Sequence, residues 1–383
     1  MKSISFKINL LWLVFLGGMS CVEPYNPPVI ENGVSILIVD GSMNPQGKSK
    51  IRLTRSQNLS ETSKVGVELK AIVSFEDEAG SALVLQEEGN GYYSLPQQTF
   101  DLQKKYRVKI TTTDAKEYAS EFVPVVKNPP IDAVSWKITS DNGVQLYVST
   151  HDFENDTRYY RWDYEESWNY TSAFNSNFEW KNGRPAIRSE NIYKCYRTQL
   201  SGKISVGSAA RLSQAVINNF PLVYLEQRSE KIRFKYSVLV NQYGLTKEAY
   251  EYWLQLQSNT ESLGTLFDPQ PSQIRGNMTC LSDNSETVLG YFTAGSTTEQ
   301  RIFINSDFLP RPKTYITSFD GCTADTLQVS SIPFLKPKDL PNILLLNPLP
   351  GGPGPITAYS TSTAACADCR SVGGTTTKPD FWQ

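Results

Sequence analysis

Short runs of β-branched and aromatic residues follow one another between positions 35 and 126, and they constrain the fold of this chain more than any other feature. Turn-forming segments such as "NPQGK", "DEAG" and "GNG" separate these runs. About six or seven short strands at this spacing are typical of a β-sandwich. Residues 34–127 are therefore predicted to form an N-terminal sandwich of the immunoglobulin or transthyretin type. The runs are "VSILIVDGSM", "SKIRLTRSQ", "VELKAIVSFED", "SALVLQEEG", "KKYRVKITTTD" and "KEYASEFVPV".

A second β-rich domain is predicted over residues 128–345. The segment "KNPPID" ends the first unit, because consecutive prolines cannot continue a paired strand. Alternating runs then resume at Val134 with "AVSWKIT", "GVQLYVSTHD" and "TRYYRWDYEESW", in the manner of a fibronectin-type sandwich. The expected fold class is therefore mainly β, with two successive sandwiches.

One helix is expected inside the second domain, near residues 246–258. The sequence there is "LTKEAYEYWLQLQSN", and the prolines of "DPQPSQI" follow it. Thr246 is placed to cap the first turn. Tyr250, Trp253 and Leu254 fall on one side of the helix, which we expect to pack against the second sheet.

Aromatic residues are concentrated between positions 159 and 180, where nine of the 22 residues are Tyr, Trp or Phe. The alternating set is predicted to face the core; it consists of Tyr160, Trp162 and Tyr164. The aromatic residues beyond it lack a clear period and are harder to place inside one sheet. We therefore predict that these side chains contact a partner; they are Phe174, Phe178 and Trp180.

A positively charged start and a short apolar run open the chain. Two lysines precede the apolar stretch 8–15, and small residues lead from it to Cys21. This pattern predicts a lipoprotein signal peptide over residues 1–20, with too few apolar residues to span a bilayer. Cys21 is the predicted lipidation site, with cleavage before it and acylation, for instance by palmitate. The alternative is an ordinary signal cut near Ser20.

The segment that follows the signal is rich in proline. Residues 21–33 contain Pro24, Pro27 and Pro28, and proline-rich segments resist compaction. We therefore predict an extended tether between the lipid anchor and the first domain.

Charge and histidine content exclude several classes of function. Lys and Arg number 37 against 39 Asp and Glu, so the chain has no field to attract nucleic acid. His151 is the one histidine, which argues against histidine-based metal sites and catalytic triads. We expect no cofactor, no metal and no enzymatic activity. The competing hypothesis is a carboxylate-based glycosidase that uses Asp163, Glu165 and Glu166 of "DYEES".

Five cysteines follow Cys21, and in an exported protein they are candidates for disulfides. Cys280, Cys322, Cys366 and Cys369 are the predicted participants, and the state of Cys195 is left open. The spacing "CADC" also occurs in redox pairs and zinc sites, but it lies here in an irregular tail rich in Gly, Pro, Ser and Thr, residues 346–383. We expect a disulfide from this cysteine pair that staples the tail.

Several motifs together resemble the Bacteroidota lipoprotein family known as domain of unknown function 4249. The longest is "KYSVLVNQYGLTKEAYEYWLQLQSNTESLGTLFDPQPSQIRGNMTCLSDNSETVLGYFTAG", residues 235–295. The opening "LIVDGSMNP…IRLTRS", the segment "YYRWDYEESW" and the closing "CADCRSVGGTTTKPDFW" are similar to that family too. The resemblance thus covers most of the chain that remains after the signal.

The resemblance implies a lipoprotein encoded beside TonB-dependent outer-membrane receptors, with no assigned catalytic residue. Glu23 is similar to the acidic signal that sends such lipoproteins to the cell surface. We therefore expect a surface-exposed outer-membrane lipoprotein that serves as a non-enzymatic accessory or binding subunit of an outer-membrane β-barrel. The barrel is a TonB-dependent receptor for nutrient uptake or belongs to another barrel machinery. The alternative is a structural or adhesion lipoprotein without transported cargo.

Overall fold

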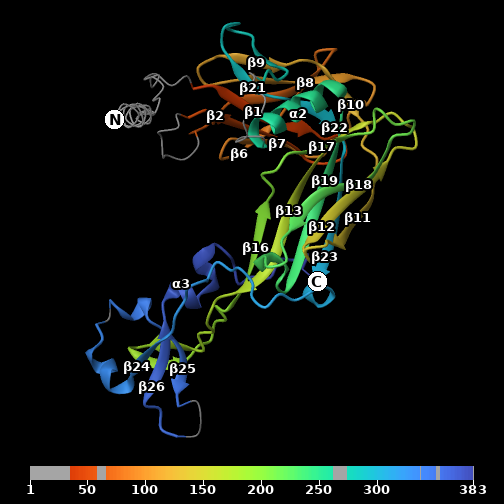
Figure 1. Cartoon of the computed structure of the whole chain (residues 1–383). Coiled ribbons are helices and arrows are strands. Elements are labelled where there is room, and N and C mark those ends of the chain that lie inside the picture. Colours follow the sequence, from red (N-terminus) through yellow and green to blue (C-terminus); the bar gives the residue numbers. More distant parts are fainter. Residues whose placement is uncertain (1–34, 58–65, 262–273, 337, 351–353, 383) are drawn as a thin grey trace, which may run out of the picture.

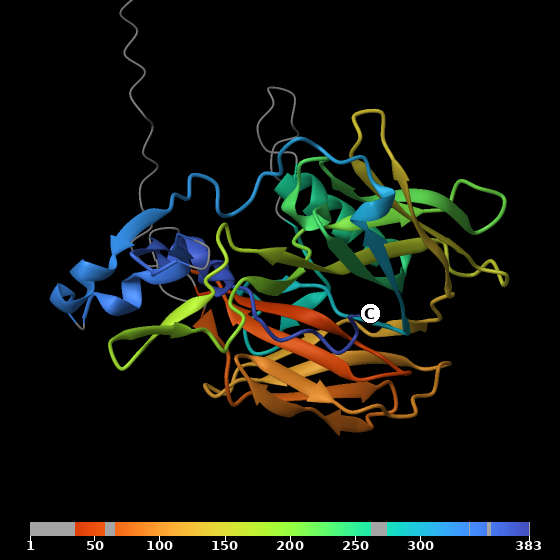
Figure 2. The same ribbon diagram turned by 90° about the horizontal axis from the view of Figure 1, so that it is seen from below.

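A computed structural model describes residues 35–57, 66–261, 274–336, 338–350 and 354–382. Figures 1 and 2 show three β modules along an elongated body: the N-terminal sandwich, a second domain, and a smaller distal module that projects to one side. The predicted mainly β fold, with successive sandwiches and one inserted helix, is confirmed. The predicted signal peptide and tether, including Cys21, lie outside the described residues. Within the described part, no helix combines the length and apolarity needed to cross a membrane.

The N-terminal sandwich is one thirteen-stranded sheet that closes over its own core. Residues from both halves meet in a single buried cluster, which includes Leu37, Ile51, Phe75 and Val108. The first half contains β1 (Leu37–Met43), β2 (Ser49–Arg55), β3 (Gly66–Val67), β6 (Gln86–Gly89), β7 (Tyr92–Leu95), β21 (Val288–Gly290) and β22 (Thr293–Gly295). The second contains β4 (Ile72–Asp77), β5 (Ala82–Val84), β8 (Lys105–Thr111), β9 (Glu117–Ser120), β10 (Val123–Val126) and β20 (Met278–Cys280).

Three of these strands come from a segment that the sequence placed in the second domain. β21 and β22 pair in parallel with β1, in a register that sets Leu37 beside Val288. β20 pairs with β9 in antiparallel fashion. The expected boundaries 34–127 and 128–345 therefore need correction, because residues 278–295 return to complete the first sandwich.

The second domain is a sandwich of two sheets around a core rich in aromatic residues. Tyr160, Trp162 and Tyr164 are buried there, as their alternation predicted. One sheet has the order β11-β12-β18, and the other β16-β13-β19-β23 with β17 beside β13. Their bounds are β11 (Ile131–Ile138), β12 (Val144–His151), β13 (Tyr159–Thr171), β16 (Lys194–Leu200), β17 (Ser205–Ser208), β18 (Val216–Leu225), β19 (Lys235–Leu245) and β23 (Thr297–Asn305). Two 3-10 turns, η1 (Glu230–Ile232) and η2 (Ser306–Phe308), flank β19 and β23.

The distal module joins a hairpin from the middle of the chain to the C-terminal region. Its sheet has the order β15-β14-β25-β26-β24. The predicted irregular tail, 346–383, is thus wrong in part, since a strand and short helices form within it. The strands are β14 (Phe178–Lys181), β15 (Arg184–Ile187), β24 (Asp325–Gln328), β25 (Leu344–Leu349) and β26 (Ala358–Ser362). The helices are η3 (Val329–Phe334), η4 (Leu340–Asn342), α3 (Ala364–Ala367) and η5 (Cys369–Val372).

A buried polar network holds the linker between the two sandwiches against the second domain. The side-chain amide of Gln242, on β19, donates to the carbonyl of Pro129 (2.9 Å) and accepts from the indole of Trp162 (2.9 Å). Asn128 donates to the backbone carbonyl of Gln242 (2.7 Å). Because buried polar groups are costly when unpaired, this network fixes the path of the linker between the domains.

We expect Gln242→Leu to lower the free energy of unfolding by about 3 kcal/mol, because the buried Trp162 indole would lose its partner and the Pro129 carbonyl would keep only its bond from Thr298. Urea denaturation followed by tryptophan fluorescence measures the change. Gln214→Leu is the matched control, because Gln214 is exposed. A loss for Gln242→Leu no larger than that of the control would contradict the network's role.

Candidate functional site

A cleft lies where helix α2 (Lys247–Glu261) meets both large domains. A cavity of about 610 Å³ separates the helix from strands β1 and β2 of the N-terminal sandwich. A second cavity, of about 530 Å³, lies between the helix, strands β13 and β19, and the loop 200–204. Asp40 and Trp253 line both cavities. We call the two compartments together the interdomain cleft.

Aromatic contacts fix the helix at this junction. The helix begins as the sequence predicted: the amide of Ala249 donates to the hydroxyl of Thr246 (3.2 Å). Tyr250 packs on Tyr159 of the second domain, with 5.1 Å between ring centroids. Tyr252 packs on Tyr291, which lies between β21 and β22 (5.0 Å). The helix therefore bridges two domains.

The prediction that one side of the helix packs against the second sheet is only partly correct. Trp253 lies at the cleft, as described above, and Tyr250 is half-buried. Leu254, which was expected to pack with them, has an exposed fraction of 43%. The helix covers the end of the second sheet rather than its full face, and Leu254 is left partly open to solvent.

An arginine stacked between aromatic rings forms the wall of the second compartment. The guanidinium carbon of Arg161 lies 4.5 Å from the ring centre of Tyr243 and 4.2 Å from that of Trp253. Cation–π contacts of this kind are favourable when they are shielded from water. Asp163 lies 3.4 Å from Arg161 and accepts a hydrogen bond from Asn241 (2.8 Å). The Nε atom of Arg161 is buried and has no hydrogen-bond partner among the described residues.

A second arginine and carboxylate face the first compartment. Asp40 and Arg52 stand opposite each other on β1 and β2. Within the described residues neither makes an ion pair, and the guanidinium of Arg52 lies over the ring of Tyr92 instead (5.0 Å). The Asp40 side chain is exposed. The cleft therefore presents an Asp and an Arg on each of its two walls.

The tyrosines of the cleft keep their protons. Burial raises the pKa of Tyr243, and the nearby charge of Asp163 raises it further. Burial also raises the pKa of Tyr252 and of Tyr291. All three hydroxyls therefore remain hydrogen-bond donors at neutral pH and above.

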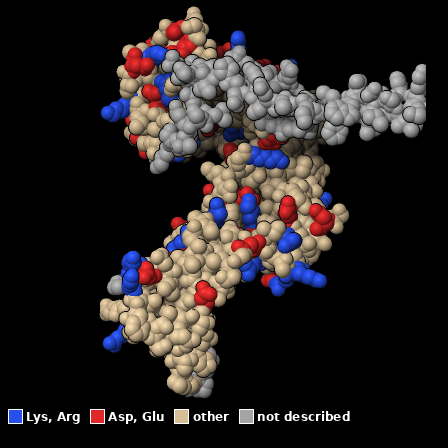
Figure 3. All heavy atoms as spheres, turned by 60° about the vertical axis from the view of Figure 1, so that its left-hand side comes forward, with Lys and Arg blue, Asp and Glu red and all other residues tan. Residues whose placement is uncertain are grey.

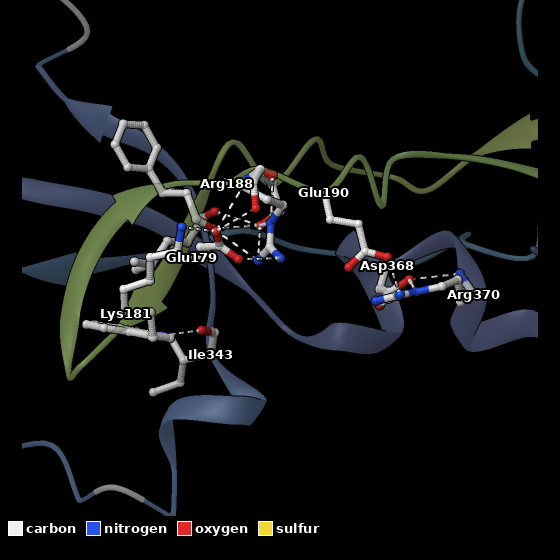
Figure 4. Close-up of polar contacts among 12 residues, drawn as sticks. Glu179, Lys181, Arg188, Glu190, Ile343, Asp368 and Arg370 are labelled. Atoms are coloured by element: carbon white, nitrogen blue, oxygen red, sulfur yellow. Dashed lines mark hydrogen bonds and ion pairs between the residues drawn. The ribbon is translucent and has the colours of Figure 1, made fainter. Parts of the chain in front are cut away.

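The predicted partner-contact residues lie elsewhere, in the distal module, and each is half-buried. Phe174 packs against the small core of that module. Phe178 meets the ring of Tyr359 edge-on (5.5 Å). The Trp180 indole donates to the carbonyl of Ile343 (2.8 Å), a bond drawn in Figure 4. These side chains help to hold the module together, so their contact with a partner stays a prediction.

Charged groups pin the same hairpin to its surroundings (Figure 4). Glu179 accepts a hydrogen bond from the amide of Ser189 (3.2 Å), which holds the pKa of this carboxyl below its usual value. Arg370 donates to Asp368 (2.7 Å) and to Glu190 (2.8 Å). Burial alone raises the pKa of Asp368, but the bonds and charge of Arg370 outweigh it and lower that pKa.

Two disulfides anchor the tail. Cys322 bonds to Cys366, both of them predicted participants. Cys369 bonds to Cys195 on β16, which the sequence had left open. Cys280 was also a predicted participant, and this is wrong: it is a free, buried thiol of β20 in the N-terminal sandwich. The chain returns to that sandwich before the tail begins, so Cys280 is far from the other four.

The carboxylates proposed for a glycosidase are each engaged. Glu165 bonds Arg301 (2.9 Å), whereas Glu166 bonds Lys231 (2.6 Å). Adjacent residues of a strand point to opposite faces, so Glu165 and Glu166 do not face a common substrate bond. Asp163 is bonded to Asn241 as described above.

Among the residues that the structure describes, His151 and the other possible metal ligands form no metal centre. His151 lies at the end of β12 and pairs with Asp132 (2.7 Å). Across the described ranges, no group of three His, Cys, Asp or Glu side chains is arranged to hold a metal ion. The expected absence of enzymatic activity stays a prediction.

The chain thus folds into β-sandwich modules, and a cleft lies at the junction of the two large domains. The chain belongs to the family described as "Domain of unknown function (DUF4249)", which matches residues 22–301. A search of the curated proteins finds none that matches.

Two solved structures have weak similarity to this chain. A segment of two fibronectin type III domains from chicken tenascin is 10% identical, with a TM-score of 0.16, over 55% of this chain and 93% of that one. The FN1–FN3 domains of chicken CNTN1 are 14% identical, with a TM-score of 0.18, over 56% and 64%. Similarities of this size say nothing about function.

Proposed function

We propose that this protein is a lipid-anchored, surface-exposed outer-membrane protein that docks onto a β-barrel and holds a ligand in the interdomain cleft. Cys21 carries the anchor, and residues 21–33 connect it to the N-terminal sandwich. The barrel is a TonB-dependent receptor or a related machinery, and the protein is its non-enzymatic binding subunit.

The surface of the distal module carries the docking part of the proposal. Residues 323–367 contain four charged side chains, namely Asp325, Lys336, Lys338 and Asp339. The module nevertheless exposes large apolar side chains: Phe334 has an exposed fraction of 85% and Ile187 of 76%. Figure 3 shows its visible face at the lower end of the molecule, largely without charged residues. These exposed apolar side chains support association through apolar contact, although the hairpin of the module also carries Glu179, Lys181 and Arg184.

Gentle detergent extraction followed by affinity purification tests the docking surface. We expect the wild-type protein to retain a β-barrel protein, identified by mass spectrometry. The double substitution Phe334→Ser and Ile187→Ser should lower the recovery of that barrel about tenfold or more, because central apolar anchors dominate binding free energy.

Phe153→Ser is the matched control, since Phe153 is equally exposed (87%) but lies in the second domain. Circular dichroism should show the same fold for all variants. Equal recovery of the barrel with the double variant would exclude this surface. Recovery of a monomer alone would exclude the barrel partner.

An adhesion or structural role is the second candidate. The elongated arrangement of three β modules in Figure 1 supports it, because such an arrangement extends a surface protein away from its anchor. It requires neither the barrel nor a ligand in the cleft. A lipoprotein gene that stands apart from any receptor gene would favour adhesion, and an adjacent receptor gene would favour docking.

A further inference from the structure

The interdomain cleft has the size of a ligand site. Its compartments of about 610 and 530 Å³ each fall within the range of small-molecule pockets. Such pockets commonly form at domain interfaces, with an apolar lining and a few polar groups that converge. Here the rings of Tyr252, Trp253 and Tyr291 supply the apolar part.

The charged groups of the cleft nearly balance. Arg52 and Asp40 lie on one wall, Arg161 and Asp163 on the other, and Lys203 stands exposed at the rim. Three cations against two carboxylates leave one net positive charge. A polyanion or a polycation would therefore meet like charge somewhere along the cleft, whereas a neutral or weakly acidic ligand would not.

The polar groups include both donors and acceptors. The protonated tyrosines and the guanidinium groups donate, whereas Asp40 and Asp163 accept. A ligand that satisfies this set carries many hydroxyl groups around apolar faces. Sugar rings have this character, because their C–H faces are apolar and their rims carry hydroxyls.

An extended peptide fits the cleft less well. Such peptides commonly bind by adding a strand to an open sheet edge. β1 is paired with β2 on one side and with β21 and β22 on the other. β13 and β19 pair with each other, and each has a further neighbour on its other side. The strands that line the cleft therefore have no unpaired edge to which a peptide strand could add, and a ligand would contact their side chains.

We propose that the interdomain cleft binds an oligosaccharide, with sugar rings on the aromatic side chains and hydroxyl groups bonded to the Arg and Asp pairs. This inference rests on the ligand-binding part of the proposed function and names the class of ligand.

Isothermal titration calorimetry with the full chain in detergent tests the inference. The probes are maltohexaose, cellohexaose, xylohexaose and mannohexaose, together with an oligogalacturonate. We expect at least one to bind, with saturation below about 10 mM. Binding of the neutral sugars alone or of the oligogalacturonate alone distinguishes a neutral from an acidic ligand. No binding by any of the five, or saturable binding of a trilysine or triglutamate peptide in place of the sugars, would overturn the proposal.

Two variants locate the bound sugar. Trp253→Ala should weaken binding about tenfold or more, since it removes the ring shared by both compartments. Asp40→Asn is the milder variant, because Asp40 is exposed and makes no ion pair within the described residues, so it should weaken binding while leaving the melting temperature unchanged. Phe153→Ser should bind normally. Wild-type affinity in Asp40→Asn and Trp253→Ala would place the sugar elsewhere and overturn the proposal. The measurement needs no barrel, so its failure is separable from failure of docking.

Discussion

Replacing Cys195 and Cys369 together by alanine will lower the free energy of unfolding by about 5 kcal/mol, the value that the chain-entropy relation gives for a loop of this length. The two residues are 174 positions apart, and their bond ties the tail to strand β16. The disulfide restricts the conformations of the unfolded chain. Its removal raises the conformational entropy of the unfolded state and so favours unfolding. Denaturation in urea without reductant measures the loss.

Cys280→Ala is the matched control for this experiment. Cys280 is buried but free, so its substitution removes a thiol without opening a loop. We expect it to cost about 1 kcal/mol, typical of a small buried truncation. Peptide mapping after alkylation should recover the Cys195–Cys369 and Cys322–Cys366 pairs. Free thiols at both Cys366 and Cys369 would refute the staple.

Cys21→Ala will release the protein from the membrane or leave it unprocessed. Two or more acyl chains bind a protein to the bilayer almost permanently, whereas a polypeptide without them has no comparable anchor. In cells labelled with radioactive palmitate, the wild-type protein should take up the label and sediment with membranes.

The Cys21→Ala variant should carry no label and should leave the mature membrane fraction. Cys280→Ala again serves as the control, because it changes a cysteine without changing the anchor. Absence of label from the wild-type protein would show that the cysteine is not acylated, and the proposed location would fail with it.

Local patterns predicted the elements of this fold well. Alternation in "YYRWDYEESW" placed Tyr160, Trp162 and Tyr164 in the core, since side chains of a strand point alternately to its two faces. Thr246 marked the start of α2 because a threonine side chain caps the free amides of a first turn. Each of these signals lies within a few residues of its effect.

Long-range pairings were not predictable from such patterns. The parallel pairing of Leu37 with Val288 joins segments 251 positions apart in the sequence, and β21 has only three residues. The disulfides required a choice among many arrangements, and Cys195 gave no local sign of its partner. Strand β26 of the distal module lies in the tail rich in Gly, Pro, Ser and Thr, where composition indicates no sheet.

The interdomain cleft was missed for the same reason. Asp40, Arg161 and Trp253 come from three separate segments, and only the tertiary fold brings them together. The odd-numbered face of β13 carries Tyr159 and Arg161, which contact α2, and no local pattern predicted that contact. The one signal in the sequence was Arg161, which stands between the aromatic residues Tyr160 and Trp162.

Photo-crosslinking in living cells tests whether the protein docks onto an outer-membrane barrel. A photoreactive phenylalanine analogue at position 334 lies at the exposed end of η3 in the distal module, whereas the same analogue at position 153 lies in the second domain. We expect irradiation to join the protein to a β-barrel from position 334 and not from position 153. The absence of any barrel adduct at position 334, or equal adducts from both positions, would contradict it.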